Sequence, residues 1–226
     1  KVNQSNLCSE IILPTNKDRT AVCCLSSLNL EYYDQWSKDP LFLKDVLEML
    51  DNVLQMFIDN APDSISRAKY SAMQERSVGV GALGFHAYLQ KNRMPWESAL
   101  AKSTNLRMFR YIRKGLDEAN LKLGKERGEA PDAAGTGLRC SHVMAVAPNA
   151  SSSILMGIWS SIIANDGSVQ HLKCLDDYEK SIYKTAMEID QRWVIEHAAD
   201  RQVFIDQAQS LNVFFRPDAN ISYLHA

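Results

Sequence analysis

The chain has 226 residues, of which 46% are hydrophobic, and its 25 basic and 27 acidic side chains leave a formal net charge of −2. This length suffices for one large core or for one lobe of a larger one, and the balanced charge argues against a nucleic-acid-binding surface. No apolar run approaches the roughly 20 residues of a membrane span and the N-terminus lacks a signal-peptide pattern, so we expect a cytoplasmic protein without a membrane partner.

The first thirty residues are predicted to be extended. Residues 5–14 form a short segment of mixed polarity that ends at a proline. Residues 20–30 are rich in side chains that suit a buried strand. Pro40 then opens a helical region, which Pro62 interrupts. Within that region the apolar residues recur at helical spacing: Leu43, Val46, Leu47, Leu50, Val53, Leu54 and Phe57.

The middle of the chain is predicted to be mainly helical. One helix is expected over residues 77–91, and a longer one over residues 98–127, with Gly128 as its C-terminal stop. Residues 129–140 contain proline and glycine and are expected to form a loop. Residues 142–147 then indicate a short buried strand that runs into a proline.

The last part of the chain is predicted to hold one long helix over residues 176–200 and a strand over residues 211–215. No repeat, low-complexity tract or linker is visible in the sequence. Helix dominates, and the few short strands cannot make a closed sheet alone. We therefore expect a helix-rich chain with no visible linker across residues 1–226.

Residues 79–84, Gly-Val-Gly-Ala-Leu-Gly, match the dinucleotide-binding pattern GxGxxG. That pattern needs a strand before it and a helix that starts inside it. Residues 69–77, which precede it, are charged and indicate a helix or a loop instead. We therefore expect these glycines to serve the close packing of a helix rather than the binding of a nucleotide.

Acidic and histidine side chains recur in the predicted last helix: Glu188, Asp190, Glu196, His197 and Asp200. A helical metal site needs ligands three or four residues apart on one face. Glu196 and His197 are adjacent and diverge by about 100° around the helix. The sequence therefore favours a solvated or salt-bridged face and no metal site.

The five cysteines include no CxxC pair and no zinc-type spacing. Cys140 and Cys174 are best explained as free thiols in a reducing cytoplasm. Cys23 and Cys24 begin an apolar, strand-like segment. Because neighbouring residues on a strand face opposite sides, only one of these two can share a cavity with Cys8. The simpler alternative is that both are small buried apolar residues.

The stretch with the clearest chemistry is Asn-Leu-Cys-Ser-Glu, residues 6–10. In an extended chain every second side chain points the same way, so Asn6, Cys8 and Glu10 are expected to share one face. A nucleophilic cysteine is usually a thiolate beside a positive group, whereas Glu10 would raise the pKa of the thiol. A thiol that loses a hydrogen atom does not need to ionise, and Glu10 could then act as a general base. The simpler alternative is a plain buried loop.

Residues 148–153, Pro-Asn-Ala-Ser-Ser-Ser, follow the predicted strand 142–147 and precede an apolar run. A helix that starts here would direct backbone N–H groups and the helix dipole toward an anion such as a phosphate. An ordinary N-cap, which serine also provides, explains the same pattern equally well.

Several segments resemble the catalytic (large) subunits of aerobic class I ribonucleotide reductases, in order along nearly the whole chain. Residues 5–11, Ser-Asn-Leu-Cys-Ser-Glu-Ile, resemble the finger loop of that family, and the finger loop as a whole would cover residues 5–14. The other similar segments are residues 21–30, 147–153, 167–172, 188–193 and 206–212. The family fold is a ten-stranded α/β barrel with the finger loop inside it. This chain would supply the loop and about half of the barrel, as the C-terminal part of the barrel domain.

The resemblance implies a role for each matching residue. Cys8 would become the thiyl radical that removes the 3′ hydrogen of the ribose, and Glu10 would take the proton of the 3′ hydroxyl. Asn6 would hold the ribose hydroxyls or Glu10 in place. Cys23, rather than Cys24, aligns with one member of the reducing cysteine pair. The substrate diphosphate would be held mainly by backbone N–H groups of Asn149, Ala150, Ser151, Ser152 and Ser153.

The implied activity, reduction of ribonucleoside diphosphates to deoxyribonucleoside diphosphates, needs parts that this sequence does not contain. The preceding half of the family would supply the second reducing cysteine, the first half-barrel, the allosteric nucleotide sites and the homodimer interface. A metal-containing small subunit would generate the radical, thioredoxin or glutaredoxin would supply the electrons, and no cofactor is expected in this chain. A gap of a few tens of residues relative to the family is expected between Gly157 and Ile158.

Three hypotheses stay open at this point. In the first, the chain is part of a radical-based catalytic subunit. In the second, it is a catalytically silent fragment that acts only by assembling with the missing barrel half. In the third, it is a small thiol-redox protein, which the lack of a CxxC pair disfavours.

Overall fold

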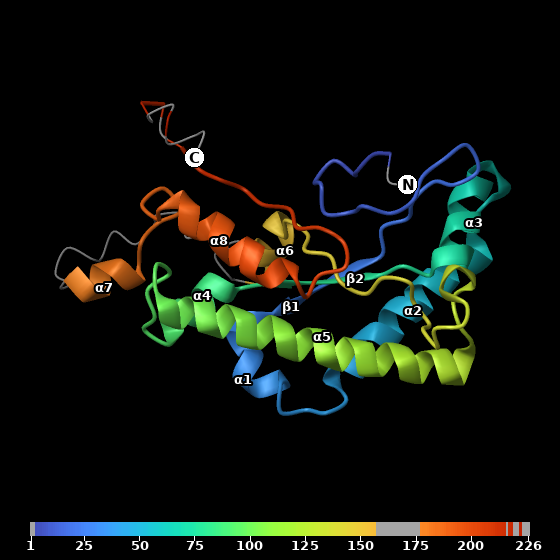
Figure 1. Cartoon of the computed structure of the whole chain (residues 1–226), viewed down its shortest axis with the longest axis horizontal. Helices are drawn as coiled ribbons and strands as arrows, with labels where there is room; N and C mark the ends of the chain where they lie inside the picture. The colour runs from blue at the N-terminus through green and yellow to red at the C-terminus, as the bar shows by residue number, and fades with distance from the viewer. Residues whose placement is uncertain (1–2, 157–176, 216, 219–221, 223–226) are drawn as a thin grey trace.

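The computed structural model describes residues 3–156, 177–215, 217, 218 and 222. The described residues form a sheet of two strands. Figure 1 shows this short sheet in the middle of the molecule, with the long helix α5 along one side and the N-terminal segment on the other. The helices are α1 (Tyr33–Trp36), α2 (Phe42–Asn60), α3 (Ser66–Glu75), α4 (Phe85–Lys91), α5 (Ala99–Arg127), α6 (Ala150–Leu155), α7 (Asp177–Ile182) and α8 (Gln191–Gln202). Short 3-10 turns lie at η1 (Leu30–Tyr32), η2 (Asp63–Ile65) and η3 (Pro131–Ala133).

The sheet is parallel, as expected for an α/β fold. Strand β1 (Leu25–Asn29) pairs with β2 (Gly79–Leu83) so that Leu25 faces Gly79. Residues 142–147 extend the sheet on the other side of β2 through a parallel bridge between Val80 and Met144. Because parallel strands point the same way, the carboxyl ends of all three segments lie at one edge, next to Pro148. The predicted strand over residues 20–30 begins later than expected, at Leu25.

The two long helices confirm the sequence prediction. The buried positions of α2 follow the expected helical spacing: Leu43, Leu47, Leu50, Leu54 and Ile58. Helix α5 starts after Ser98, whose side chain accepts a hydrogen bond from the Ala101 N–H, and it ends at Gly128, which has φ +87°. The two helices pack closely, since a Cβ at Gly115 would lie 2.4 Å from Leu43 Cδ1.

The predicted helix over residues 77–91 is wrong in its first half. Residues 79–83 form strand β2, and the helix α4 starts only at Phe85, after Gly84 with φ +76°. A Cβ at Gly81 would lie 2.6 Å from the Ala145 carbonyl oxygen, so the glycine lets two extended segments approach each other. The first five residues of the GxGxxG pattern therefore form a strand, and Gly79 and Gly81 serve strand packing rather than helix packing. Gly84 lies between this strand and α4.

The predicted long helix over residues 176–200 is two shorter helices, α7 and α8. Asp190 ends the connection between them, because its side chain accepts a hydrogen bond from the Arg192 N–H and caps α8. His197 does not lie on a solvated face: it is fully buried, and its Nε2 lies 3.0 Å from the Trp96 carbonyl oxygen. Residues 211–215 do not form the predicted strand, and Phe214 instead donates its N–H to the Gln191 side chain.

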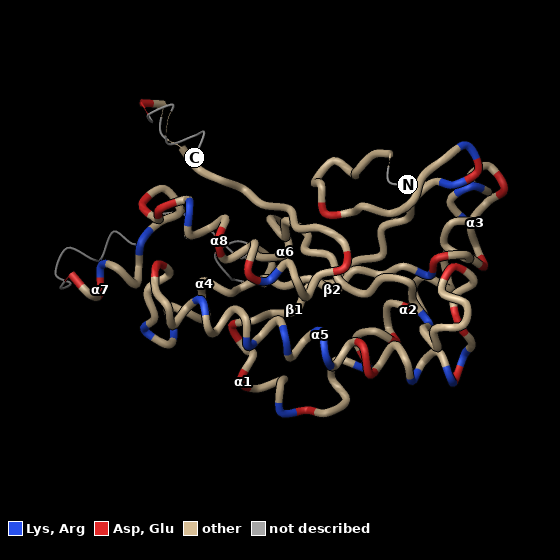
Figure 2. Tube along the Cα trace, in the orientation of Figure 1, with Lys and Arg blue, Asp and Glu red and all other residues tan. Residues whose placement is uncertain are grey.

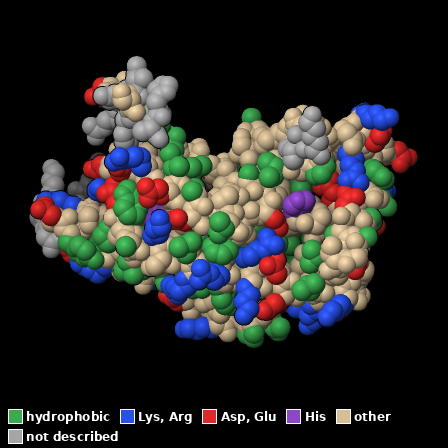
Figure 3. Space-filling view, viewed as in Figure 1, with side chains coloured by type: hydrophobic (Ala, Val, Ile, Leu, Met, Phe, Trp, Pro, Cys, Tyr) green, Lys and Arg blue, Asp and Glu red, His purple; other side chains and the backbone are tan. Residues whose placement is uncertain are grey.

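Charged side chains of both signs are interspersed along the outer helices (Figure 2). On α5 they form ion pairs one turn apart: Arg113–Asp117, Lys114–Glu118 and Lys122–Glu126. On the face that Figure 3 shows, basic, acidic and hydrophobic side chains are mixed. Among the described residues, no helix has the length and apolar character needed to cross a membrane. No group of three or more histidine, cysteine or acidic side chains in that part of the chain could hold a metal ion.

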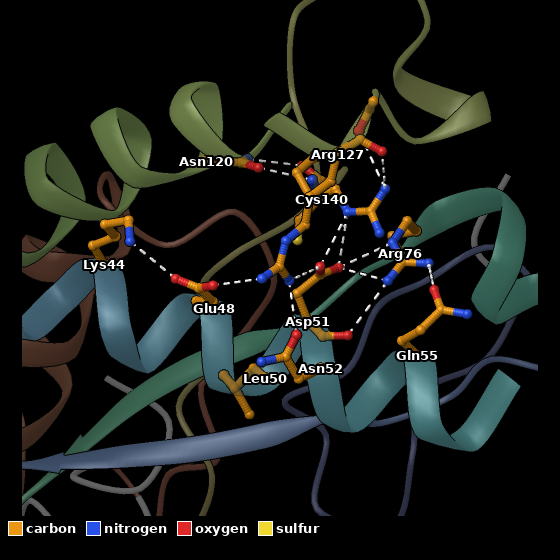
Figure 4. A network of polar contacts seen from close by, with 12 residues as sticks. Lys44, Glu48, Leu50, Asp51, Asn52, Gln55, Arg76, Asn120, Arg127 and Cys140 are labelled. Carbon is orange, nitrogen blue, oxygen red and sulfur yellow. Dashed lines mark hydrogen bonds and ion pairs between the residues drawn. The ribbon is translucent and has the colours of Figure 1, made fainter. Parts of the chain in front are cut away.

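One buried carboxylate joins α2, α3 and α5 (Figure 4). Asp51 of α2 is 1% exposed and accepts hydrogen bonds from Arg76 (2.6 Å to Nη2), Arg127 (2.8 Å to Nη1) and Arg139 (3.0 Å to Nε). Burial opposes ionisation of this carboxyl, but the three guanidinium groups outweigh it and hold the pKa of Asp51 below its usual value. Nearby, Asn120 bonds both backbone polar groups of the buried, free Cys140.

Candidate active site

The segment that carries Asn6, Cys8 and Glu10 is a turn rather than an extended chain. Ser9 has φ +68°, and its N–H donates to the Asn6 carbonyl oxygen at 3.1 Å. Leu7 is 99% exposed at the tip of this turn. The expectation that alternation along an extended chain brings Asn6, Cys8 and Glu10 onto one face is therefore wrong. Their spatial relation follows instead from the fold of the turn.

Glu10 is held at the base of this turn. Its side chain is 3% exposed, and its backbone oxygen accepts the Ala208 N–H at 3.0 Å. Asn6 Oδ1 accepts the N–H of Ile11, the residue that follows Glu10, at 3.0 Å. This bond holds the Asn6 side chain against the backbone next to Glu10. Glu10 Oε2 is buried without a hydrogen-bond partner among the described residues. A buried carboxylate oxygen of this kind is costly unless a further group completes it.

The structure brings Cys23, and not Cys24, to this turn. Burial raises the pKa of the Cys23 thiol, and the nearby carboxylate of Glu10 and thiol of Cys8 raise it further. Cys24 points the other way: it is buried, and its thiol donates to the Leu50 carbonyl oxygen of α2 at 3.6 Å. Cys23 is exposed and Cys24 is buried, so the two neighbouring side chains face different surroundings, as alternation along an extended segment predicts.

The turn at residues 148–153 lies at the carboxyl edge of the sheet. Asn149, with φ +58°, donates its side-chain amide to the carbonyl oxygens of Ala82 and Ala147, and α6 starts at the next residue. Ser153 is fully buried: its N–H donates to the Asn149 carbonyl oxygen and its hydroxyl to the Ala150 carbonyl oxygen. Ser153 thus has no donor left for a ligand.

The first-turn amides of α6 are free in the described part of the chain. The N–H groups of Ala150, Ser151 and Ser152 have no hydrogen-bond partner there, and these three residues are exposed. They line an open pocket of about 610 Å³, together with residues of β1: Leu25, Ser26, Ser27 and Asn29. Cys23 precedes that stretch of β1 by two residues, about 7 Å along an extended chain. The pocket therefore reaches from the start of α6 to the first residues of β1.

Two contributions to this site were not predicted from the sequence. Residues 208–210 bond both to Val146 and to Glu10, so they tie the turn to the sheet edge. Ser26 and Ser27 line the pocket, although the sequence marks them only as part of an apolar strand. The similarity of residues 206–212 to a family segment could have indicated the role of residues 208–210. Alternation along β1 could have indicated that Ser27 faces the pocket.

Comparisons with known proteins agree on one family. A family model described as "Ribonucleotide reductase, barrel domain" matches residues 1–134 and 158–226. The ribonucleoside-diphosphate reductase large subunits of Invertebrate iridescent virus 6 and Invertebrate iridescent virus 3 are 47% and 46% identical to the chain, over 97% and 99% of its length. The solved class Id ribonucleotide reductase alpha subunit of Actinobacillus ureae superimposes on 99% of the chain with a TM-score of 0.93 and 35% identity.

The chain spans half or less of each of these proteins. It covers 28% of the first viral subunit, 43% of the second and 50% of the Actinobacillus ureae chain. The matches extend over 266 and 270 aligned positions in the viral subunits, which is more than the 226 residues of the chain. These relatives therefore hold stretches that this sequence lacks. The gap predicted between Gly157 and Ile158 lies outside the described residues.

Proposed function

Because the chain belongs to the ribonucleotide reductase barrel-domain family, we propose that it carries the reaction centre for the radical-based reduction of ribonucleoside diphosphates to deoxyribonucleoside diphosphates. The observation that carries this proposal is the grouping of Cys8, Cys23 and the buried Glu10 at one turn. The chain has the α/β fold of the ribonucleotide reductase barrel domain. Within it, we propose that the chain is the C-terminal part of the ten-stranded barrel and that residues 5–14 are the finger loop.

Each side chain has a distinct part in the proposed reaction. As a thiyl radical, Cys8 takes the 3′ hydrogen atom of the ribose, so that an S–H bond forms as the C3′–H bond breaks. Glu10 accepts the proton of the 3′ hydroxyl, and that hydroxyl is the partner its buried Oε2 otherwise lacks. Asn6 holds the turn through its bond to the Ile11 N–H. Cys23 is one of the two thiols that are oxidised to a disulfide.

The electrostatics of the site suit this chemistry better than nucleophilic catalysis. A nucleophilic cysteine needs a lowered pKa and a positive neighbour. Burial, Glu10 and Cys8 instead raise the pKa of Cys23, which keeps a proton on this thiol at neutral pH. Each thiol of a reducing pair supplies one electron and one proton when the disulfide forms, so the protonated state of Cys23 suits this role. Cytoplasmic localisation, which keeps such thiols reduced, is part of the proposal.

The free amides of Ala150, Ser151 and Ser152 form the proposed diphosphate site. We expect inorganic pyrophosphate to bind the chain in the pocket beside them, because N–H groups at a helix start attract anions. Backbone groups dominate, so Ser151→Ala should weaken binding by less than about threefold. Ser151→Pro, which removes one N–H at a helix position that tolerates proline, should weaken it by about tenfold or more.

Isothermal titration calorimetry of these two variants with pyrophosphate checks the expectation. The pair shares one position, so a general effect of changing Ser151 is controlled. Equal weakening by alanine and proline would show that the hydroxyl, rather than the backbone amide, holds the anion. Protection of the α6 amides from hydrogen exchange by pyrophosphate is the corresponding direct observation.

The proposed enzyme needs partners that supply what this chain does not hold. A preceding region would provide the second reducing cysteine, the remaining barrel wall, the allosteric nucleotide sites and a homodimer interface. A metal-containing small subunit would generate the radical, and thioredoxin or glutaredoxin would reduce the disulfide. No cofactor is proposed in this chain itself.

The proposed function is tested by reconstitution. We expect the chain alone, with a dithiol reductant, to form no deoxyribonucleoside diphosphate. Mixed with the preceding barrel half and the radical-generating subunit, within the full length of the family's catalytic subunit, it should form product in a single-turnover assay. Failure of every reconstituted mixture, with the subunits shown to assemble, would favour a catalytically silent fragment. Product from the chain alone would contradict the need for the other half-barrel.

A further inference from the structure

The polypeptide between Glu10 and Cys23 forms a hairpin whose two arms end at the candidate active site. One arm is residues 11–15, and the other is residues 20–24. The turn between them is closed by Asn16 and Arg19, whose backbones exchange two hydrogen bonds of 3.2 and 3.3 Å. Glu10 precedes one arm and Cys23 lies in the other, so the hairpin connects the segment that carries Cys8 to the segment that carries Cys23.

The two arms hold each other only weakly. In the described structure, no backbone hydrogen bond joins residues 11–15 to residues 20–24. A small pocket of about 130 Å³ lies between them, lined by residues of both arms: Ile11, Leu13, Thr15, Thr20, Ala21 and Cys23. Ile11 and Leu13 bury their side chains against Ala145, which fixes the first arm. Ala21 of the second arm packs against the same cluster, and the Cys24 carbonyl oxygen accepts the Gly79 N–H at 2.8 Å. The end of this arm next to the turn is held by different contacts.

Arg19 provides an anchor at the turn. Its guanidinium donates two hydrogen bonds to the carboxylate of Asp132 in η3, one of them 2.9 Å long, and its Nη1 lies 3.6 Å from Glu75 Oε1 of α3. The same guanidinium stacks over the Tyr70 ring at 5.6 Å. The Arg19 side chain is only 17% exposed, so water weakens these contacts less than it weakens a surface ion pair.

The backbone around Arg19 is bonded to Arg67 of α3, the helix that also carries Glu75. The Thr20 N–H donates to the Arg67 carbonyl oxygen at 3.4 Å, and the Arg67 side chain donates to the Lys17 carbonyl oxygen at 3.1 Å. A planar guanidinium that bonds both oxygens of one carboxylate fixes direction as well as distance, which a lysine ammonium cannot do. The turn is thus held in one orientation on α3 and η3.

From these contacts we propose that Arg19 is a positioning residue, whose clamp to Asp132 and Glu75 sets the hairpin register and thereby the approach of Cys23 to Cys8. The catalytic value of that approach rests on the proposed function, because it matters only if both thiols serve one reaction. The positions of the two thiols do not rest on the proposed function. They predict a measurable proximity of two thiols in the chain without nucleotide or turnover.

The test uses a bimane reagent that carries two bromomethyl groups and links two thiols that lie a few ångströms apart. Each thiolate displaces one bromide ion, and mass spectrometry of the linked peptides identifies the Cys8–Cys23 product. We expect Arg19→Ala and Asp132→Asn to lower the initial linking rate by about fivefold, and Arg19→Lys to fall between them and the unchanged chain. Lys17→Ala, an exposed change in the same turn, is the matched control and should link at the unchanged rate.

A pH profile separates this role from a merely structural one. The pKa of Glu75 is raised to about 7: burial raises it most, Arg19 lowers it, Asp132 raises it, and a hydrogen bond from Ser77 lowers it. Ser77 in turn contacts Ser141 and His142. Above pH 7 the ionised Glu75 adds to the clamp, and below it the contribution is lost. The linking rate of the unchanged chain divided by that of Glu75→Gln should therefore exceed one above pH 7 and approach one below it.

Cys140, which is fully buried, reports whether a variant stays folded. The proposal is overturned if Arg19→Ala and Asp132→Asn link at the unchanged rate with Cys140 still protected. It is equally overturned if the unchanged chain forms no link, or if both variants expose Cys140, because the clamp would then hold the fold rather than the register. If only Arg19→Ala exposes Cys140, the rate of Asp132→Asn decides. None of these outcomes depends on nucleotide reduction, so failure here is distinct from failure of the proposed function.

Discussion

Asp51→Ala is expected to lower the free energy of unfolding by about 3–5 kcal/mol, the usual cost of removing one partner from a buried ionic network. The carboxylate is 1% exposed, and it is bonded by Arg76, Arg127 and Arg139. Alanine would leave three guanidinium groups facing one another without the charge that brings them together. Arg76 is itself 6% exposed and cannot turn to solvent without disturbing the end of α3.

Urea unfolding followed by circular dichroism measures this loss. Asp59→Ala, an exposed change on the same helix, is the matched control and should shift stability by less than about 0.5 kcal/mol. Because the pKa of Asp51 is lowered in the fold, its stabilising contribution is complete above the ordinary aspartate pKa and is lost as the pH falls below it. The difference between the parent and Asp51→Ala should therefore shrink below about pH 4. A loss under about 1 kcal/mol at neutral pH would contradict the role of this carboxylate.

The long helices could be predicted because their signals are local. In α2 the apolar spacing repeats over five turns, and in α5 a serine cap and a terminal glycine mark both ends. Strand β2 carries no such signal. Its glycines are explained by segments that are distant in sequence: Gly79 lies against the Leu25 and Ala145 side chains, and Gly81 lies against the Ala145 carbonyl oxygen. The Asp51 network was not predicted for the same reason, since its arginines lie 25, 76 and 88 residues away.

The candidate site shows where the alternation rule for extended chains fails and where it holds. Alternation was expected to bring Asn6, Cys8 and Glu10 together, but a left-handed residue, Ser9, turns the chain between them. Alternation did apply at Cys23 and Cys24, where a real strand follows and the two side chains diverge. The resemblance selected Cys23 of the two. The positive φ of Ser9 could not be read from the sequence, because serine seldom adopts it.

The largest effect on activity is expected at Cys8, and Cys24 provides its control. In the reconstituted enzyme, Cys8→Ser should abolish deoxyribonucleotide formation while pyrophosphate binding and the unfolding midpoint stay close to those of the parent. The reason is bond chemistry: the thiol gives up and regains its hydrogen atom reversibly, whereas the much stronger O–H bond of serine does not relay it. The partly buried position of Cys8 in a turn tolerates serine, so loss of fold is not expected to confuse the result.

Cys24→Ser should keep substantial activity in the same assay. The Cys24 thiol faces α2, where it donates to the Leu50 carbonyl oxygen, and a serine hydroxyl retains a donor for that oxygen. The measurement is single-turnover formation of deoxyribonucleoside diphosphate by the parent, Cys8→Ser and Cys24→Ser enzymes. It compares the same cysteine-to-serine change at two positions of one fold. If the Cys8→Ser enzyme were active and the Cys24→Ser enzyme inactive, the reacting thiol would be Cys24, which faces α2. That result would contradict the proposed roles of Cys8, Glu10 and Cys23.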